Sequence, residues 1–224
     1  MKFLRASMLV VAGVLVLAPF ARAQRMGMGG NAPQIPGQFK PVVGNGAEYQ
    51  VQSKKENMNW AYAIVGKESV DGKDAYWMEV RMLSPKAQGM IIKELMVLEG
   101  EMPEIKRMIV QSAGQEPMEM PAGMMGMMKR GQQSAQQHAG GTSAGLGEKI
   151  GSETVTVPAG TFVCDHYRTN SDGKPADVWI STKISPYGLV KMTSADTTMV
   201  LAKVLENETS QITGEPRKFE MPHF

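Results

Sequence analysis

The sequence predicts a mainly β protein, built as a single curved antiparallel meander that forms a half-barrel. Apolar and polar residues alternate with a period of two over about ten short runs, and turn-forming residues separate those runs. An open sheet of about ten strands curls or closes rather than staying flat. Many runs carry apolar residues on both sides of the strand, so we expect the concave face of this sheet to hold an apolar ligand.

The runs before residue 114 predict the first half of the meander. Asp71-Gly72 is a strong hairpin signal, because both residues accept a positive φ. Apolar residues alternate on both arms of this turn. β-branched residues favour strands over a short helix in the two runs that follow. We expect strands at Glu48–Ser53, Met58–Ile64, Tyr76–Met82, Met90–Leu98 and Ile105–Ser112.

The runs after residue 147 predict the second half. Pro158-Ala159-Gly160 has the residue types of a type I turn, and Asp172-Gly173 and Pro186-Tyr187-Gly188 turn the chain again. Each turn separates two alternating runs, so neighbouring strands should pair as hairpins. We expect strands at Ile150–Val157, Thr161–Arg168, Asp177–Ser181, Leu189–Thr193, Thr198–Leu205 and Glu208–Thr213.

The first 23 residues have the features of a secretory signal peptide. Lys2 and Arg5 are positive, residues 8–17 are apolar, and Ala21-Arg22-Ala23 is a small-x-small cleavage site. We expect cleavage after Ala23 and a periplasmic location. The alternative, an uncleaved membrane anchor, needs a longer apolar run, and no later segment is apolar for long enough to span a bilayer.

Composition and charge divide the rest of the chain. We expect a signal peptide at 1–23, a flexible leader at 24–46, one β domain at 47–213 with an insert at 114–147, and a flexible tail at 214–224. The chain has 24 basic and 22 acidic residues, and the signal peptide holds three basic and no acidic ones, so 21 face 22 after cleavage. Because no basic stripe with interleaved aromatic residues occurs, we expect no nucleic-acid partner.

The insert at 114–147 is rich in methionine in its first half and in Gln, Ser and Gly in its second. Three interpretations stay open: an adaptable apolar flap, a thioether site for Cu(I), or an insert without a role. A short helix at Met124–Gln137 is compatible with the composition. The predicted ligand-binding residues are Met118, Met120, Met124, Met125, Met127, Met128, Trp60 and Trp77; the alternative metal ligands are Met124, Met125, Met127, Met128 and His138.

The candidates for chemistry are few. Cys164 and His166 are two residues apart on one predicted strand, but a Cys–His catalytic pair needs an activated thiolate and a third orienting group. Alternation with Phe162 instead predicts a buried, inert thiol, which we favour over an intermolecular disulfide. Trp60 and Trp77 each lie within an alternating strand, which is also typical of core positions. We expect neither an enzyme nor a cofactor.

Four stretches resemble the TapB-like proteins, an exported bacterial domain-of-unknown-function family. They are Val70–Met82, Val155–Tyr167, Asp177–Ser181 and Pro186–Met192, and the likeness covers Glu48–Leu205 without the insert. The family is similar in architecture to the lipoprotein carriers (LolA/LolB-like), in which a curved antiparallel sheet surrounds acyl chains. The resemblance implies a non-enzymatic, exported half-barrel and carries no catalytic residue onto this chain.

Three functions follow from these patterns. The first is an exported protein that binds an apolar ligand such as a lipid, or the lipidated end of another protein, on the concave face of its sheet. The second is a periplasmic Cu(I)-binding protein that uses the methionine cluster. The third is an assembly factor for an envelope complex or appendage, which binds an envelope protein through exposed strand edges.

Overall fold

The computed structural model describes residues 37–54, 57–83, 89–99, 102–121, 123, 125–126, 146–171 and 174–218. The predicted signal peptide and residues 24–36 of the predicted leader lie outside these ranges, so both stay predictions. Residues 35–224 form one compact unit, and the description below concerns that unit alone.

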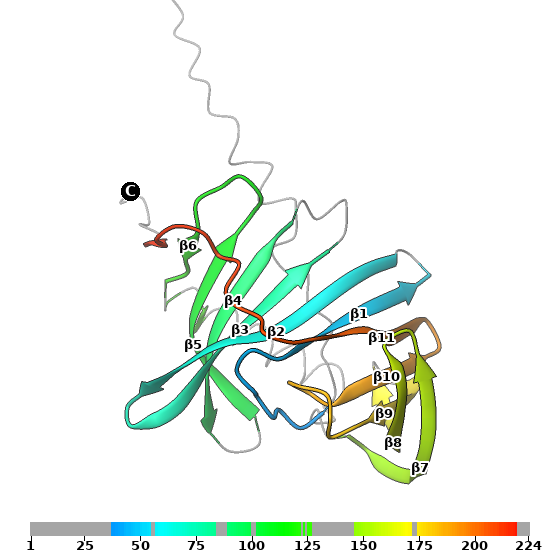
Figure 1. The fold of residues 1–224 in the computed structure, drawn as a ribbon. Coiled ribbons are helices and arrows are strands. Elements are labelled where there is room, and N and C mark those ends of the chain that lie inside the picture. The colour runs from blue at the N-terminus through cyan, green and yellow to red at the C-terminus, as the bar shows by residue number, and fades with distance from the viewer. Residues whose placement is uncertain are drawn as a thin grey trace, which may run out of the picture. The chain divides into compact units, whose positions relative to one another are not determined.

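Twelve strands occur among the described residues, and they belong to one sheet (Figure 1). Most of them begin and end within a few residues of the runs of alternating hydropathy. The strands are β1 (Gly46–Ser53), β2 (Asn57–Val70), β3 (Lys73–Met82), β4 (Ile91–Glu99), β5 (Met102–Gln111), β6 (Met118–Glu119), β7 (Glu148–Val157), β8 (Gly160–Ser171), β9 (Lys174–Ile180), β10 (Leu189–Ser194), β11 (Thr197–Leu205) and β12 (Arg217–Lys218).

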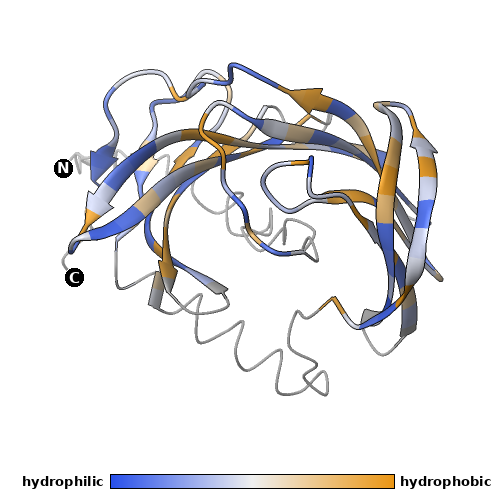
Figure 2. Cartoon of the chain, turned by 60° about the horizontal axis from the view of Figure 1, so that its bottom comes forward, coloured by the Kyte–Doolittle hydropathy of each residue, from blue (hydrophilic) through white to orange (hydrophobic). Residues whose placement is uncertain are grey.

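The strand order is β12-β6-β5-β4-β3-β2-β1-β11-β10-β9-β8-β7. Strands β1 to β5 form one meander and β7 to β11 form a second, and pairing of β1 with β11 joins the two. Neighbouring strands are antiparallel except β12, which is parallel to β6. The sheet is open and bent into an arch (Figure 2), so the predicted fold class, a mainly β half-barrel, is confirmed.

The turn between β2 and β3 has the predicted residues in the predicted conformation. Asp71 has a φ of 51° and Gly72 a φ of 76°. Both residue types accept this left-handed region, glycine because it has no Cβ and aspartate because its short side chain bonds locally. Neither residue is buried, so local backbone preference rather than packing selects this turn.

The register divides the side chains between two faces. Residues directly opposite each other on antiparallel strands point to the same side of a sheet. Met78 of β3 lies opposite Glu94 of β4, and Glu94 lies opposite Met108 of β5. Their chain neighbours Glu79 and Lys93 form the next pair and therefore point to the other side. We call the side of Met78 the aromatic–methionine face and the side of Glu79 the strap face.

The strap is the segment 206–216, which follows β11 and crosses β3, β4 and β5 (Figure 1). The prediction of a strand at Glu208–Thr213 is wrong, because this segment has no strand ladder. Several of its backbone groups bond to side chains instead, while the Glu208 amide donates to the Gly44 carbonyl. The Gln211 amide donates to the carboxylate of Glu79, and the Thr213 amide donates to Oε1 of Gln111.

Two short strands, β6 and β12, extend the sheet at the edge formed by β5. β6 lies within the predicted insert, and β12 lies within the predicted tail. The Met125 amide donates to the Pro121 carbonyl at 3.2 Å, which is a helical hydrogen bond, while residues 127–137 of the predicted helix lie outside the described residues. Among the residues described, no helix is long and apolar enough to cross a membrane.

Candidate functional site: the aromatic–methionine face

One continuous apolar row runs across strands β2 to β5. Ile64 lies opposite Met78, Met78 opposite Glu94, and Glu94 opposite Met108. The Met120 amide then donates to the Met108 carbonyl at 2.9 Å, which continues the row past the edge of β5. All members except Glu94 are buried apolar residues. Thioether side chains adapt to irregular apolar shapes, so this row has the composition of a surface that accepts varied apolar partners.

Aromatic rings continue this face toward β1. Tyr62 packs edge-on against Tyr49 at a centroid distance of 6.0 Å and against Tyr187 at 6.2 Å. Phe39 lies 5.3 Å from Tyr187. The Tyr49 hydroxyl donates to the Leu189 carbonyl at 3.0 Å, and the Tyr187 hydroxyl donates to the Met78 sulfur at 3.6 Å. Burial raises the pKa of Tyr49, Tyr62 and Tyr187, so these phenols stay neutral.

The segment between β9 and β10 brings Tyr187 onto this face. Its hydrogen bonds to the chain before β1 hold it there: the Lys40 amide donates to the Pro186 carbonyl, and the Ser185 hydroxyl donates to the Lys40 carbonyl. Gly188 has a φ of 77°, and a Cβ there would lie 2.9 Å from a methyl carbon of Ile180. Only glycine fits that turn without displacing its neighbour.

Glu94 is the carboxyl group of the row. It is partly buried, and burial raises its pKa to about 7. Its charge raises the pKa of Tyr62 and of Tyr187, so the three groups lie close enough to interact electrostatically. Among the described residues no side chain forms a hydrogen bond or ion pair with Glu94. A carboxyl group in this setting is free to bind a group supplied from outside.

Trp60 and Trp77 do not form one site. Trp60 lies opposite Met82 and shares the face of Met78, whereas Trp77 is an odd number of residues from Met82 and points to the strap face. The two tryptophans therefore face opposite sides of the sheet, because a strand directs successive side chains to opposite faces, and their predicted role in ligand binding stays a prediction. The buried indole nitrogen of Trp60 has no hydrogen-bond partner, and Trp77 instead donates to Glu68 at 3.0 Å.

The described residues include only part of the predicted methionine cluster. Met118 lies opposite Val110, whose register puts it on the aromatic–methionine face, and Met118 is 41% exposed. Met120 is buried on the same row as Met108. Met125 is partly buried. Met124, Met127, Met128 and His138 lie outside the described residues, so the flap and the Cu(I) site that use them stay predictions.

The sequence analysis missed Glu94 and Tyr187 as site residues. The signal for Glu94 is a single glutamate inside the apolar run Ile91–Leu98. Whether it points to the apolar side depends on the register of β3, β4 and β5, which includes a shift between Leu95 and Met96. Tyr187 sits in a turn, where alternation gives no information about its direction.

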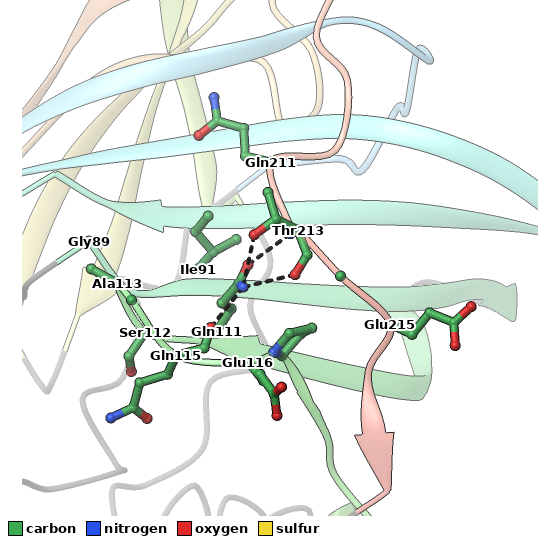
Figure 3. Close-up of a pocket in the computed structure, with 13 residues that line it drawn as sticks. Gly89, Ile91, Gln111, Ser112, Ala113, Gln115, Glu116, Gln211, Thr213 and Glu215 are labelled. Carbon is green, nitrogen blue, oxygen red and sulfur yellow. Dashed lines mark hydrogen bonds between the residues drawn. The ribbon is translucent and has the colours of Figure 1, made fainter.

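The strap face carries a pocket of about 580 Å³ (Figure 3). Gln111, at the end of β5, lines it together with the turn at Ser112–Gln115 and the strap residues Thr213 and Gly214. The side-chain Nε2 of Gln111 donates to the Gln115 carbonyl at 2.9 Å and to the Thr213 carbonyl at 3.0 Å. Its polar atoms are therefore used to hold the strap, and the pocket lies on the side of the sheet that faces away from Glu94.

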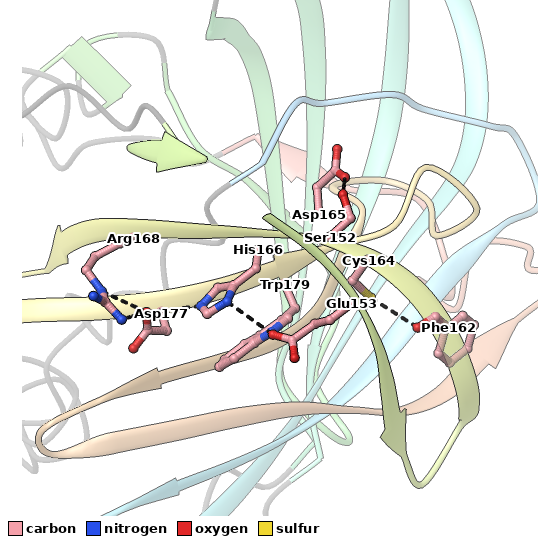
Figure 4. A network of polar contacts seen from close by, with 9 residues as sticks. All are labelled: Ser152, Glu153, Phe162, Cys164, Asp165, His166, Arg168, Asp177 and Trp179. Atoms are coloured by element: carbon pink, nitrogen blue, oxygen red, sulfur yellow. Dashed lines mark hydrogen bonds and ion pairs between the residues drawn. The ribbon is translucent and has the colours of Figure 1, made fainter. Parts of the chain in front are cut away.

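A polar network ties strands β7, β8 and β9 together (Figure 4). Nδ1 of His166 lies 3.1 Å from Glu153 and Nε2 lies 3.1 Å from Asp177. The imidazole stacks on Trp179 at 4.4 Å, and Trp179 donates to Glu153 at 2.6 Å. Because both ring nitrogens of His166 contact carboxylates, the ring is not directed at the neighbouring thiol.

Cys164 is a buried thiol, as predicted. It donates weakly to the Phe162 carbonyl at 3.7 Å, and burial raises its pKa to about 11. Because the thiolate is the nucleophile, a thiol held protonated is inert. Nor do the described residues contain a group of three or more His, Cys, Asp and Glu side chains placed to hold a metal ion.

No family model matches the sequence, and no curated protein matches it. Two solved structures show a slight similarity to this chain. One is a presumed lipoprotein from Parabacteroides distasonis, with 13% identity, a TM-score of 0.36, and coverage of 76% of this chain and 100% of that chain. The other is a presumed exported protein with a YmcC-like fold from Bacteroides fragilis, with 9% identity, a TM-score of 0.38, and coverage of 77% and 100%. Likenesses this slight leave the TapB-like resemblance a prediction.

Proposed function

We propose that this chain is an exported, non-enzymatic protein that binds an apolar ligand, or the lipidated end of a protein partner, on its aromatic–methionine face. The observation that carries the proposal is a continuous apolar face that holds one carboxyl group, Glu94, for which the described residues supply no partner. Ligand sites typically combine apolar walls with a few polar groups. The predicted signal peptide supports export.

The edges of this face support the same proposal. Met118 is 41% exposed, and Met58, Tyr76 and Met82 are partly buried rather than buried. A ligand laid along the face would cover these side chains and gain about 25 cal/mol for each Å² of apolar surface removed from water.

Native mass spectrometry of the protein purified from envelope extracts tests whether a ligand is bound. We expect adduct masses that disappear on organic extraction. A clean unliganded mass, together with no uptake of an uncharged fluorescent apolar probe, would overturn the proposal.

Contact quenching by a brominated fatty alcohol tests which face binds. Trp60 lies on the aromatic–methionine face, while Trp77 lies on the strap face, so the two tryptophans are matched reporters. We expect the brominated alcohol to quench the wild-type protein and the Trp77→Phe variant, and Trp60→Phe to lose most of the quenching. Quenching that disappears with Trp77 instead would place the ligand on the wrong face and contradict the proposal.

A further inference from the structure

We propose that Glu94 is the anchor for a cationic amine, so that the ligand of the aromatic–methionine face is an amphiphile with an ammonium head and an apolar tail. This inference rests on the proposed function and names the chemical class of the ligand. Glu94 stands between Met78 and Met108 in a row that is otherwise apolar, so the polar group of a ligand lying along this row has one carboxyl to meet.

The surroundings of Glu94 favour a cation over an anion. The carboxylate is negative, and it interacts electrostatically with Tyr62 and Tyr187, whose aromatic rings are a type that attracts cations. Two of the described cations on β4 and β5, Lys93 and Arg107, lie over the ring of Trp77 on the strap face. A third, Lys106, forms an ion pair with Glu104. An anionic head at Glu94 would therefore meet a like charge.

Protonation adds a second preference. Without a ligand, burial holds the pKa of Glu94 at about 7, because the ionised form lacks a partner. An ammonium group supplies that partner. Its hydrogen bond to Glu94 becomes stronger as the carboxyl ionises, since hydrogen bonds between charged groups are about twice as strong as neutral ones. The other titratable groups that interact with Glu94 are the phenols of Tyr62 and Tyr187, whose pKa values are raised, so they stay neutral over this range.

The test compares dodecylamine with dodecanol, which have the same chain and differ in the charged head. Each displaces a fluorescent apolar probe from wild type, Glu94→Gln and Glu94→Asp, at concentrations below micelle formation. Glu206→Gln removes an exposed carboxyl of the strap and is the matched control. At pH 8 we expect wild type and the control to prefer the amine about tenfold, which corresponds to ~1.4 kcal/mol. Glu94→Gln should lose the preference and keep its affinity for dodecanol, and Glu94→Asp should retain part of the preference.

A measurement on the unmodified protein covers the case in which Glu94→Gln does not fold. The wild-type preference for the amine should fall toward one as the pH drops from 8 to 5, because Glu94 becomes protonated while an alkylamine stays charged. If dodecanol fails to bind wild type, the proposed function itself is wrong. If dodecanol binds but the amine gains nothing, or gains equally in Glu94→Gln and at pH 5, the binding face stands and the role of Glu94 is overturned.

Discussion

Glu79 and Glu94 lie on neighbouring strands of the same sheet, yet they face opposite sides and meet opposite conditions. Glu79 is fully buried and accepts hydrogen bonds from the Ser210 hydroxyl and the Gln211 amide of the strap. Glu94 is partly buried and has no such partner among the described residues. A buried carboxyl with its bonds made stabilises a structure, whereas one without them costs free energy. On the strap face the chain itself therefore supplies partners for the buried carboxyl of Glu79. On the aromatic–methionine face the described residues supply none for Glu94.

Polar side chains of the sheet bind the strap and close the strap face. Three buried polar residues of the sheet hold the strap: Glu79, Arg81, which pairs with Glu208, and Gln111, which brackets Thr213. On the same face, Ala75, Leu95 and Val97 form a small apolar cluster that packs against Trp77. The aromatic–methionine face has no comparable set of polar clamps among the described residues. Each face has one buried N–H without a partner among the described residues, Nε of Arg81 on the strap face and the indole of Trp60 on the other. What separates the two faces is therefore the carboxyl of Glu94, for which the described residues supply no partner.

The largest effect should come from breaking the strap. Glu79→Ala leaves the Gln211 amide and the Ser210 hydroxyl without their acceptor, and we expect the free energy of unfolding in urea to fall by about 4 kcal/mol. Glu79→Gln keeps one acceptor oxygen and should lose less. The binding of apolar probes to the opposite face should change little while the protein is folded. A loss no greater than that of the exposed Glu206→Ala would show that the strap does not depend on Glu79.

Adjacent residues on β4 test the two faces separately. Leu95 points to the strap face and Met96 to the aromatic–methionine face, and both are buried. Leu95→Ala and Met96→Ala should each lower the free energy of unfolding by about 3 kcal/mol, because each leaves a cavity. Only Met96→Ala should also weaken the binding of an uncharged fluorescent apolar probe. Equal losses of binding in both variants would remove the distinction between the faces.

The smallest effect concerns Glu94 and pH. Its pKa in the folded protein is about 7, above the ordinary 4.5, so the folded state binds more protons than the unfolded state between these values. Stability from this group is therefore full below pH 4.5 and is lost as the pH rises to 7. The full shift would correspond to about 3 kcal/mol. Because Glu94 is only partly buried and solvent screens its charge, we expect wild type to lose on the order of 1–2 kcal/mol relative to Glu94→Gln across that window, measured by urea unfolding at pH 4.5, 6 and 8. A constant difference between the two proteins would mean that Glu94 is not desolvated.

Local patterns predicted the strands well because their causes are local. The Asp71-Gly72 turn needs only two residues that accept positive φ. The alternating hydropathy of β3 reflects the different surroundings of the two faces of that strand. The strap could not be predicted in the same way. Glu208–Thr213 has the composition of a strand, but its hydrogen-bond partners are side chains more than a hundred residues earlier, so it forms no ladder.

The sequence by itself determined the mainly β half-barrel, the Asp71-Gly72 turn and the buried thiol of Cys164, because period-two hydropathy and turn chemistry act over a few residues. The tertiary structure decided which side each residue faces. Register across β2 to β5, with its shifts at Ile64/Gly66 and Leu95/Met96, separates Trp60 from Trp77 and Glu94 from Glu79. A shift of one residue reverses every side chain of a strand, and no pattern within a single strand contains that information.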